Sequence, residues 1–267
     1  MTEKKSNPVQ CLEKALILLA ELALVAKDID LKEVSRRANL SKSTASRLLA
    51  TMEQRGIVRQ NRLSRRFSLG SDLIRLGSIA SDQLGLSELS HPFLEELMEA
   101  SGETTSLAIL SNNQALYIDQ ALSLSMIRSF PPVGTYIDLH CSAVGKVLLS
   151  ELPPDQIQRV FQAKGLAAYT KNTITNSNQL LKLLEAVREN GYAVDLEEKE
   201  IGGVCIAAPL RNYAGRIVAA VGISGPSNRI TAEKLQSLAQ RVVQAAKKAS
   251  AQLGHALPDQ RYSRLED

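Results

Sequence analysis

Residues 30–56 read DLKEVSRRANLSKSTASRLLATMEQRG. Two short amphipathic stretches follow one another here, and each opens with a residue that can cap a helix: Asp30, which has Glu33 three residues later, and Ser41. Asn39 lies between them and tolerates the left-handed conformation of a tight corner, while Gly56 ends the second stretch. The segment therefore predicts a helix-turn-helix over about residues 31–54.

The second predicted helix has two different faces. Its expected buried side is formed by Ala45, Leu48, Leu49 and Met52. The opposite face carries small polar residues and cations, namely Lys42, Ser43, Ser46, Arg47 and Ala50. Short donors and cations near a helix N-terminus can reach phosphates and base edges without holding the helix out of the groove. This is the pattern of a recognition helix.

The flanking segments complete a winged helix-turn-helix domain. A helix is expected to start at Asn7-Pro8-Val9-Gln10, followed by an apolar series that predicts one buried stripe: Val9, Leu12, Leu16, Leu19 and Ala23. On the other side, residues 57–60 and 66–69 predict a two-stranded hairpin, the wing, around a basic turn. The candidate DNA-binding residues are Arg36, Ser41, Lys42, Ser43, Thr44, Ser46, Arg47, Arg62, Arg65 and Arg66.

The charge of the chain is divided unevenly. The formal net charge is +4, but residues 1–70 hold 14 lysines and arginines against 7 acidic residues, while the remainder has 18 against 21. Residues 32–66 alone hold ten cations and two glutamates. A basic first part predicts a polyanionic partner, double-stranded DNA, whose binding weakens with salt through counterion release. A basic interaction module is the alternative reading.

Several classes of protein are not supported. The three cysteines, Cys11, Cys141 and Cys205, have no C-x-x-C spacing, and the three histidines are widely separated, so we expect no disulfide, no metal site and no cofactor. Neither a signal peptide nor a membrane span is indicated, because the longest apolar run, residues 15–26, is interrupted by Glu21. We expect a cytoplasmic protein without a membrane partner.

Five segments, in order, resemble the IclR family of transcription regulators across nearly the whole chain. They are LSKSTASRLL (40–49), LHCSAVGKVLL (139–149), GYAVDLEE (191–198), GVCIAAP (203–209) and ISGP (223–226). The resemblance implies an α+β protein with an N-terminal winged helix-turn-helix, a linker helix and a C-terminal GAF-like effector-binding domain, in which helices pack around a curved, largely antiparallel sheet. It also implies an operator-binding regulator, more often a repressor than an activator, and not an enzyme.

The local sequence fits that expectation. Strands are predicted at residues 104–110, 115–120, 126–130, 192–196, 204–210 and 216–224, and helices at 142–150, 155–164, 177–189 and 232–253. The expected domains are residues 1–70 (DNA binding; wing at about 57–69), 71–86 (linker helix), 87–255 (effector binding and oligomerisation) and 256–267 (C-terminal tail). In the family, the linker helix and the winged domain form dimers, which the effector domains pair into tetramers.

A candidate effector site lies at Cys141-Ser-Ala-Val-Gly145, where the chain turns into a helix. Free N–H groups and the helix dipole favour an anion there. By resemblance, the pocket uses Ala143, Val144, Asp195, Cys205, Gly222 and Ser224, and Ser129 completes its wall. The favoured effector is a small organic acid. Family members that bind very small acids often have serine in place of Gly222, so a larger acid is favoured somewhat more here.

Two rival functions are weighed against this. An enzyme would need a paired base and nucleophile, and Cys141 beside His140 does not supply one, because adjacent residues of an extended strand point to opposite faces. A nucleotide sensor would need phosphate-binding cations, and the small apolar residues at the helix start offer few. The effector, the operator, the sign of the response and the oligomeric state remain open at this point.

Overall fold

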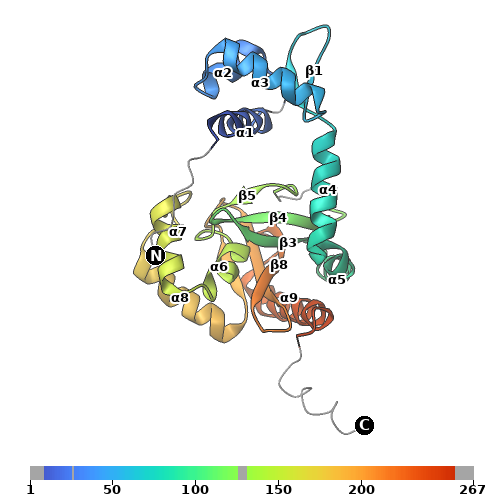
Figure 1. The fold of residues 1–267 in the computed structure, drawn as a ribbon. Helices are drawn as coiled ribbons and strands as arrows, with labels where there is room; N and C mark the ends of the chain where they lie inside the picture. The colour runs from blue at the N-terminus through green and yellow to red at the C-terminus, as the bar shows by residue number, and fades with distance from the viewer. Residues whose placement is uncertain (1–8, 26, 126–130, 256–267) are drawn as a thin grey trace, which may run out of the picture. The chain divides into compact units, whose positions relative to one another are not determined.

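The chain consists of two compact units, Met1–Gln83 and Leu84–Asp267. The structure, a computed structural model, describes residues 9–25, 27–125 and 131–255 (Figure 1). Each unit has its own hydrophobic core. In the described part of the chain, no helix is both long enough and apolar enough to cross a membrane.

The first unit contains the predicted helix-turn-helix and wing. Helices α1 (Gln10–Ala23), α2 (Leu31–Arg37) and α3 (Lys42–Gln54) are followed by β1 (Val58–Gln60) and β2 (Phe67–Leu69), which pair antiparallel. The Asp30 carboxylate caps α2 by accepting from the Glu33 N–H at 2.9 Å, and the Ser41 hydroxyl caps α3 by accepting from the Thr44 N–H at 3.2 Å. Asn39 has φ 52° at the corner.

Most of the buried stripe predicted for α1 is wrong: only Leu19 of its five residues packs, partly buried, against the core. Leu18 and Leu22 are the fully buried residues, whereas Val9, Leu12 and Leu16 are exposed. The helix carries apolar side chains on two neighbouring rows, and only one of them packs against α2, α3 and β2. Periodicity identifies a helix but cannot decide which of two apolar rows meets the core. The expected helix start at Asn7-Pro8 lies outside the described residues.

Helix α4 (Asp72–Leu84) overlaps the segment expected to link the two units. Gly85, with φ 63°, separates α4 from α5 (Leu86–Ser101), which the sequence analysis did not predict as a helix of its own. Leu94 and Leu97 of α5 are buried in the core of the second unit. The left-handed conformation at Gly85 thus allows the chain to end one helix and start another within one residue.

The second unit is built on a six-stranded antiparallel sheet. Its strands are β3 (Thr104–Ser111), β4 (Gln114–Ala121), β5 (Tyr136–Ile137), β6 (Ala193–Leu196), β7 (Gly203–Arg211) and β8 (Ile217–Pro226), in the order β5-β4-β3-β8-β7-β6. Five of the predicted strands are present. The two-residue β5 was not predicted, and the strand expected at residues 126–130 lies outside the described part.

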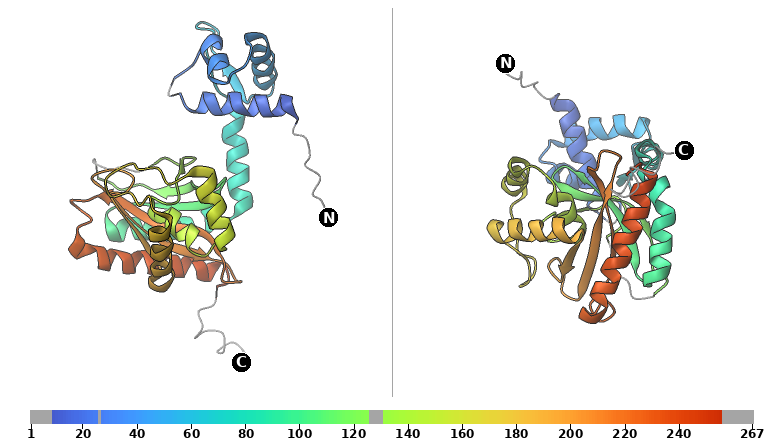
Figure 2. Two further views of the ribbon diagram at one scale, coloured as in Figure 1. Left: turned by 90° about the vertical axis from the view of Figure 1, so that its left-hand side faces the viewer. Right: turned by 90° about the horizontal axis from the view of Figure 1, so that it is seen from below.

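Helices cover both faces of this sheet. Helices α5 and α9 (Ala232–Gln252) lie side by side on one face (Figure 2). Helix α6 (Ala143–Ser150) lies on the other face, with α7 (Pro154–Lys164) following it and α8 (Ser177–Asn190) packed against it. The predicted α+β class with an antiparallel sheet is confirmed. All eight residues of α6 are buried, which places its N-terminus inside the unit.

Candidate DNA-binding helix and effector pocket

The outer face of α3 carries the residues expected to reach DNA. Lys42, Ser43, Ser46, Arg47 and Ala50 are exposed, while Ala45, Leu49 and Met52 are buried beneath them. Among the described residues, neither Lys42 nor Arg47 takes part in an ion pair. Their charges are therefore free to meet a phosphate or a base edge.

The start of α3 is a cluster of hydroxyl groups. The Ser41 oxygen lies 3.0 Å from the Ser43 oxygen and 2.9 Å from the Thr44 oxygen, in addition to capping the helix. The main role of the Ser41 hydroxyl is thus to cap α3. Substituting it would destabilise α3 as well as remove a possible contact with DNA.

Arg36 is less available than the sequence suggested. Its guanidinium donates to the Glu33 carboxylate at 2.9 and 2.6 Å, and Arg37 donates to the same carboxylate at 2.8 Å. These two arginines lower the pKa of Glu33 to about 2 through their hydrogen bonds. Glu33 therefore offsets part of the positive charge on α2, so a phosphate would compete with it for Arg36.

The wing presents three arginines in its turn. Arg62, Arg65 and Arg66 are all exposed. The Asn61 side-chain oxygen accepts from the N–H groups of Leu63 and Ser64 at 3.0 and 3.1 Å, which fixes the turn. A short turn with a fixed conformation and three arginines is better suited to contacting DNA phosphates than to recognising bases.

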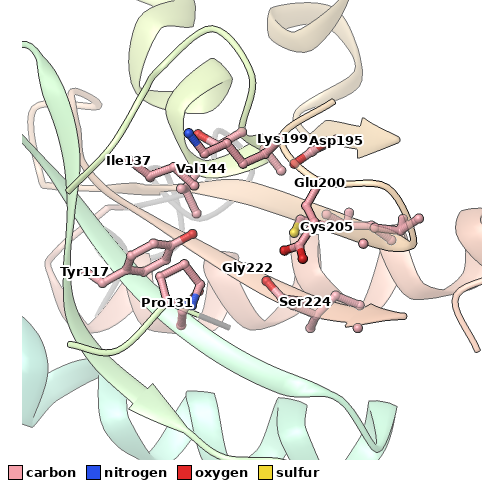
Figure 3. A pocket seen from close by; sticks show the side chains of 18 residues that line it. Tyr117, Pro131, Ile137, Val144, Asp195, Lys199, Glu200, Cys205, Gly222 and Ser224 are labelled. Carbon is pink, nitrogen blue, oxygen red and sulfur yellow. The ribbon is translucent and has the colours of Figure 1, made fainter. Parts of the chain in front are cut away.

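In the second unit, one pocket brings together residues from α6 and from all six strands of the sheet (Figure 3). Six residues suggested by the family resemblance line it: Ala143, Val144, Asp195, Cys205, Gly222 and Ser224. Ser129 lies outside the described residues. The empty space, counting the part open to solvent, is about 600 Å³.

Backbone donors point out of the start of α6. The Ser142 oxygen accepts from the Gly145 N–H at 3.2 Å, and the Ser142 carbonyl accepts from the Lys146 N–H at 2.9 Å. This leaves the N–H groups of Ala143 and Val144, the first two of the helix, without an acceptor in the part of the chain that the structure describes. Two such N–H groups at a helix N-terminus can bind a carboxylate.

Gly145 is required by the same arrangement. A Cβ atom at this position would lie 2.4 Å from both the Cα and the carbonyl oxygen of Leu139. The absence of a side chain therefore lets the preceding turn fold back over the first turn of α6, where the Ser142 hydroxyl donates to the Asp138 carbonyl at 2.8 Å.

The pairing of neighbouring strands brings together the residues that form the floor of the pocket. Asp195 pairs with Cys205 and Cys205 with Ser224, while Gly222 pairs with Ser106 on β3. A Cβ atom on Gly222 would lie 2.8 Å from the Ile206 carbonyl oxygen and 3.4 Å from Val144. A serine at position 222 would crowd this floor, so glycine keeps it open beneath Val144.

Asp195 is a buried carboxylate that faces the pocket. It accepts from the Glu198 N–H at 2.7 Å. Burial raises the pKa of Asp195 to about 6, although this hydrogen bond and the nearby Lys146 act in the opposite direction. Its charge state therefore changes close to neutral pH.

Beneath the pocket, a buried ion pair ties α6 to the turn after β6. Lys146 is 0% exposed, and its ammonium donates to the Glu198 carboxylate and, at 2.8 Å, to the Val194 carbonyl. The second oxygen of Glu198 is buried without a hydrogen-bond partner among the described residues. The pair fixes the position of α6 relative to Asp195, which lies between Val194 and Glu198 in the chain.

The cysteines do not form a catalytic arrangement. Burial raises the pKa of the Cys141 thiol and of the Cys205 thiol to about 12 each. His140 and Cys141 lie in a turn and not in the extended strand expected from the sequence. A ring nitrogen of His140 lies 3.0 Å from the Ala167 carbonyl oxygen, while the Cys141 thiol donates to the Asp138 carbonyl at 3.8 Å. Both side chains are thus satisfied by the backbone.

Four polar residues that line the pocket were missed from the sequence: Ser106, Tyr117, Lys199 and Glu200. Ser106 and Tyr117 belong to β3 and β4, which precede all the other lining residues in the chain. Lys199 and Glu200 directly follow the segment 191–198, and their closeness to Asp195 was the one available signal. In the described ranges, no group of three or more histidine, cysteine, aspartate or glutamate residues is placed to hold a metal ion.

A helix-turn-helix with a cationic outer face, followed in the chain by a second unit that contains a pocket, defines a class of two-domain DNA-binding regulators. Two family models match the chain: the IclR helix-turn-helix domain over residues 11–62 and the bacterial transcriptional regulator IclR C-terminal domain over residues 79–251. The chain belongs to the IclR family. It is a transcriptional regulator with a helix-turn-helix DNA-binding domain, and not an enzyme.

Individual relatives agree with this assignment. The chain is 36% identical to the acetate operon repressor of Salmonella typhimurium over 255 residues, which are 95% of this chain and 93% of that protein. The IclR structure from Thermotoga maritima, with 30% identity and a TM-score of 0.74, matches 93% of this chain and all of that one. An IclR homolog from Microbacterium hydrocarbonoxydans, solved with 4-hydroxybenzoate, shares the fold at 24% identity and a TM-score of 0.81, covering 91% and 98%.

Lys146→Met should destabilise the second unit by about 3–5 kcal/mol, because the Glu198 carboxylate remains buried without its partner. The double variant Lys146→Met/Glu198→Leu should recover most of this loss, since neither charge is then buried. Urea unfolding followed by circular dichroism measures both, with Lys182→Met at an exposed position of α8 as the control. Equal stability of the single and double variants would contradict the ion-pair argument.

The raised pKa of Asp195 has a consequence for stability. The folded state favours the neutral carboxyl of Asp195. The group therefore stabilises the folded state below about pH 4, and this stabilisation is lost as the pH rises through about 6. Between pH 4 and 7, the wild type should lose up to about 3 kcal/mol relative to Asp195→Asn, at about 1.36 kcal/mol for each pKa unit. Parallel stability curves for the two proteins in urea would show that Asp195 titrates normally.

Proposed function

We propose that the protein is a cytoplasmic repressor of a catabolic operon and that a small organic acid controls its affinity for the operator. The observation that carries this proposal is the combination of an exposed, unpaired cationic face on α3 with two free N–H groups in the pocket at the start of α6. An activator of the same architecture is the alternative.

For operator binding, the proposal assigns direct contacts to α3 and backbone contacts to the wing. Lys42, Ser43, Ser46 and Arg47 are the residues expected to enter the major groove, and Thr44 lies at the helix start beside them. Arg62, Arg65 and Arg66 would contact phosphates. One copy covers few base pairs, so a homodimer, or a homotetramer built from two dimers, should bind a pseudo-palindrome.

The domain boundaries belong to the same proposal. Residues 1–70 bind DNA, residues 71–86 link, residues 87–255 bind the effector and associate, and residues 256–267 form a tail. The separation of the chain into Met1–Gln83 and Leu84–Asp267 supports placing the junction near α4. The named repressor among the relatives supports repression as the response.

For the effector, the proposal places a carboxylate on the N–H groups of Ala143 and Val144, with more distant polar groups of the ligand near Asp195, Cys205 and Ser224. The acid found with the Microbacterium homolog supports this class of ligand. A nucleotide is disfavoured because Lys199 is the only cation lining the described pocket, and Asp138 and the Tyr169 ring already engage it.

Effector binding would control DNA binding by favouring one arrangement of the effector domains and hence one separation of the two recognition helices in a dimer. A coupling of about 1–3 kcal/mol changes operator affinity about 5- to 150-fold. The chain runs from α4 directly into α5, which packs on β3 and β4, two of the strands near the pocket. This connection supplies a mechanical route for the coupling.

Replacing the cations of α3 tests the DNA interface. Lys42→Ala/Arg47→Ala should weaken binding to the footprinted operator by at least about tenfold and lower the salt slope by about 0.9 for each phosphate that the variant no longer neutralises. Gel-shift titrations over a range of salt measure both quantities. Lys182→Ala removes an exposed cation from α8 and should leave binding unchanged. Wild-type affinity in the double variant would mean that α3 is not the recognition helix.

Ala143→Pro tests the anion site while preserving the helix. Proline fits the first helical position, and Ser142 already has the extended conformation that a residue before proline requires (φ −134°, ψ 146°). The variant loses one of the two N–H donors, so carboxylates that raise the melting temperature of the wild type should bind it about tenfold more weakly. Ser177→Pro, at the same position of α8, is the control.

Melting of the unliganded variants checks that both prolines are tolerated. The same acids should shift operator affinity in gel-shift assays of the wild type. Stabilisation grows with ligand concentration as expected for binding to the native state, by about 2.7 kcal/mol at a hundred times Kd. If no acid altered melting temperature or operator affinity, the proposed control by an organic acid would be wrong.

A further inference from the structure

The polar groups of the pocket lie on two opposite sides (Figure 3). Tyr117 and Val144 lie on one side, where Tyr117 shares a packed cluster with Ala143 and Val144 at the start of α6. Asp195 and Glu200 lie on the other side. The first side offers hydrogen-bond donors, the second carboxylates. A ligand that fits both must have two different ends.

Tyr117 supplies a donor that the rest of the described structure leaves unused. Tyr117 is 4% exposed, its hydroxyl points into the pocket, and no described residue forms a hydrogen bond with that hydroxyl. Burial raises the pKa of Tyr117 far above its usual range, so the group stays protonated. Because the hydroxyl faces the pocket, a ligand or a water molecule in the pocket can accept its hydrogen bond.

Glu200 supplies the acceptor on the opposite side. It follows Lys199 in the turn between β6 and β7, and its carboxylate points into the pocket without a hydrogen bond or ion pair to the described residues. Lys199 does not neutralise it: the Lys199 ammonium lies 3.3 Å from the centre of the Tyr169 ring and 3.9 Å from the Asp138 carboxylate. The Glu200 charge therefore remains available to a ligand.

The turn that carries Glu200 is held in place from three directions. Thr170 donates to the Glu197 carbonyl at 2.7 Å, and Thr173 donates to the Glu198 carbonyl at 2.6 Å. The Glu197 carboxylate accepts from the Gly202 N–H at 3.1 Å, and Lys146 anchors Glu198 from below. Such a turn presents Glu200 in a preorganised position, which reduces the entropy lost when a ligand binds.

We propose that the effector is a carboxylic acid with a hydrogen-bond donor, a hydroxyl or an ammonium group, at its opposite end. The Tyr117 hydroxyl joins the N–H groups of Ala143 and Val144 in binding the carboxylate. Glu200, assisted by Asp195, accepts from the donor group. This inference rests on the proposed control by an organic acid and adds the identity of the second functional group, together with two specificity-determining residues.

Other acids fit this arrangement less well. A simple monocarboxylic acid would leave Glu200 and Asp195 facing an apolar end. A dicarboxylic acid would bring a second negative charge against both, and like charges at short range oppose binding. A hydroxyl or ammonium group satisfies these carboxylates, and an ammonium group adds an opposite charge.

The test uses the full-length protein and probes that differ in one functional group. Isothermal titration calorimetry compares pentanoate, 5-hydroxypentanoate, 5-aminopentanoate and glutarate, and in parallel benzoate, 4-hydroxybenzoate, 4-(aminomethyl)benzoate and terephthalate. In at least one series, a donor-bearing acid should bind about tenfold or more tightly than its parent, as expected for a hydrogen bond to a charged group. The dicarboxylic acid should bind most weakly. Comparison of the hydroxyl-bearing acids with the ammonium-bearing acids shows which of the two donor groups the pocket prefers.

Two variants assign the ends of the ligand. Glu200→Gln should remove most of the preference for the donor-bearing acid over its parent acid. Tyr117→Phe should weaken parent and donor-bearing acids by the same factor, about five- to tenfold. The matched controls are Glu185→Gln at an exposed position of α8 and Tyr213→Phe in the exposed turn after β7, and both should behave as the wild type.

The outcomes distinguish failure of the two-ended ligand from failure of the proposed control by an organic acid. If acids bind but the parent or the dicarboxylic acid binds best in both series, the two-ended pocket is wrong and control by an organic acid stands. Unchanged affinities in Tyr117→Phe and unchanged preferences in Glu200→Gln, with folding verified by melting curves, overturn the assigned residues. If no acid in either series binds, the proposed effector class falls and this inference falls with it.

Discussion

The effector unit depends on one constraint: α6 is enclosed on all sides, yet its first turn must stay open to the pocket. Gly145 satisfies the first requirement by letting the preceding turn pack directly on the helix. The ion pair between Lys146 and Glu198 satisfies the second, because it fastens the helix to the β6–β7 turn from beneath. Removing two charges from water is expensive, so such a pair contributes more to a defined geometry than to net stability.

Local rules in the sequence predicted the DNA-binding unit well. The caps at Asp30 and Ser41 and the left-handed corner at Asn39 each depend on a few neighbouring residues, and all three are present. The buried side of α1 was wrong because two apolar rows compete there, and the choice between Leu18 and Leu16 is made by tertiary packing. Helix α5 was missed because a single residue, Gly85, separates it from α4.

The pocket was predictable only in part, for a similar reason. Ala143, Val144 and Asp195 lie in motifs that the family resemblance could locate, and the anion-binding role of a helix start is a local argument. Tyr117 reaches the pocket through pairings between β4, β3 and β8, and β8 is separated from the other two by about a hundred residues of chain. No local pattern encodes such pairings. Residues contributed by distant strands are therefore those that the sequence alone hides.

The order of the strands places the pocket across the two halves of the sheet. The sheet consists of two halves, β5-β4-β3 and β8-β7-β6, which are joined where β3 pairs with β8. Tyr117 and Ser106 belong to the first half, while Cys205, Gly222 and Asp195 belong to the second. A ligand that contacts both sides of the pocket would thus bridge this seam. Because α5 packs on β3 and β4 and directly follows α4, any shift at the seam would act on the chain segment that leads to the DNA-binding unit.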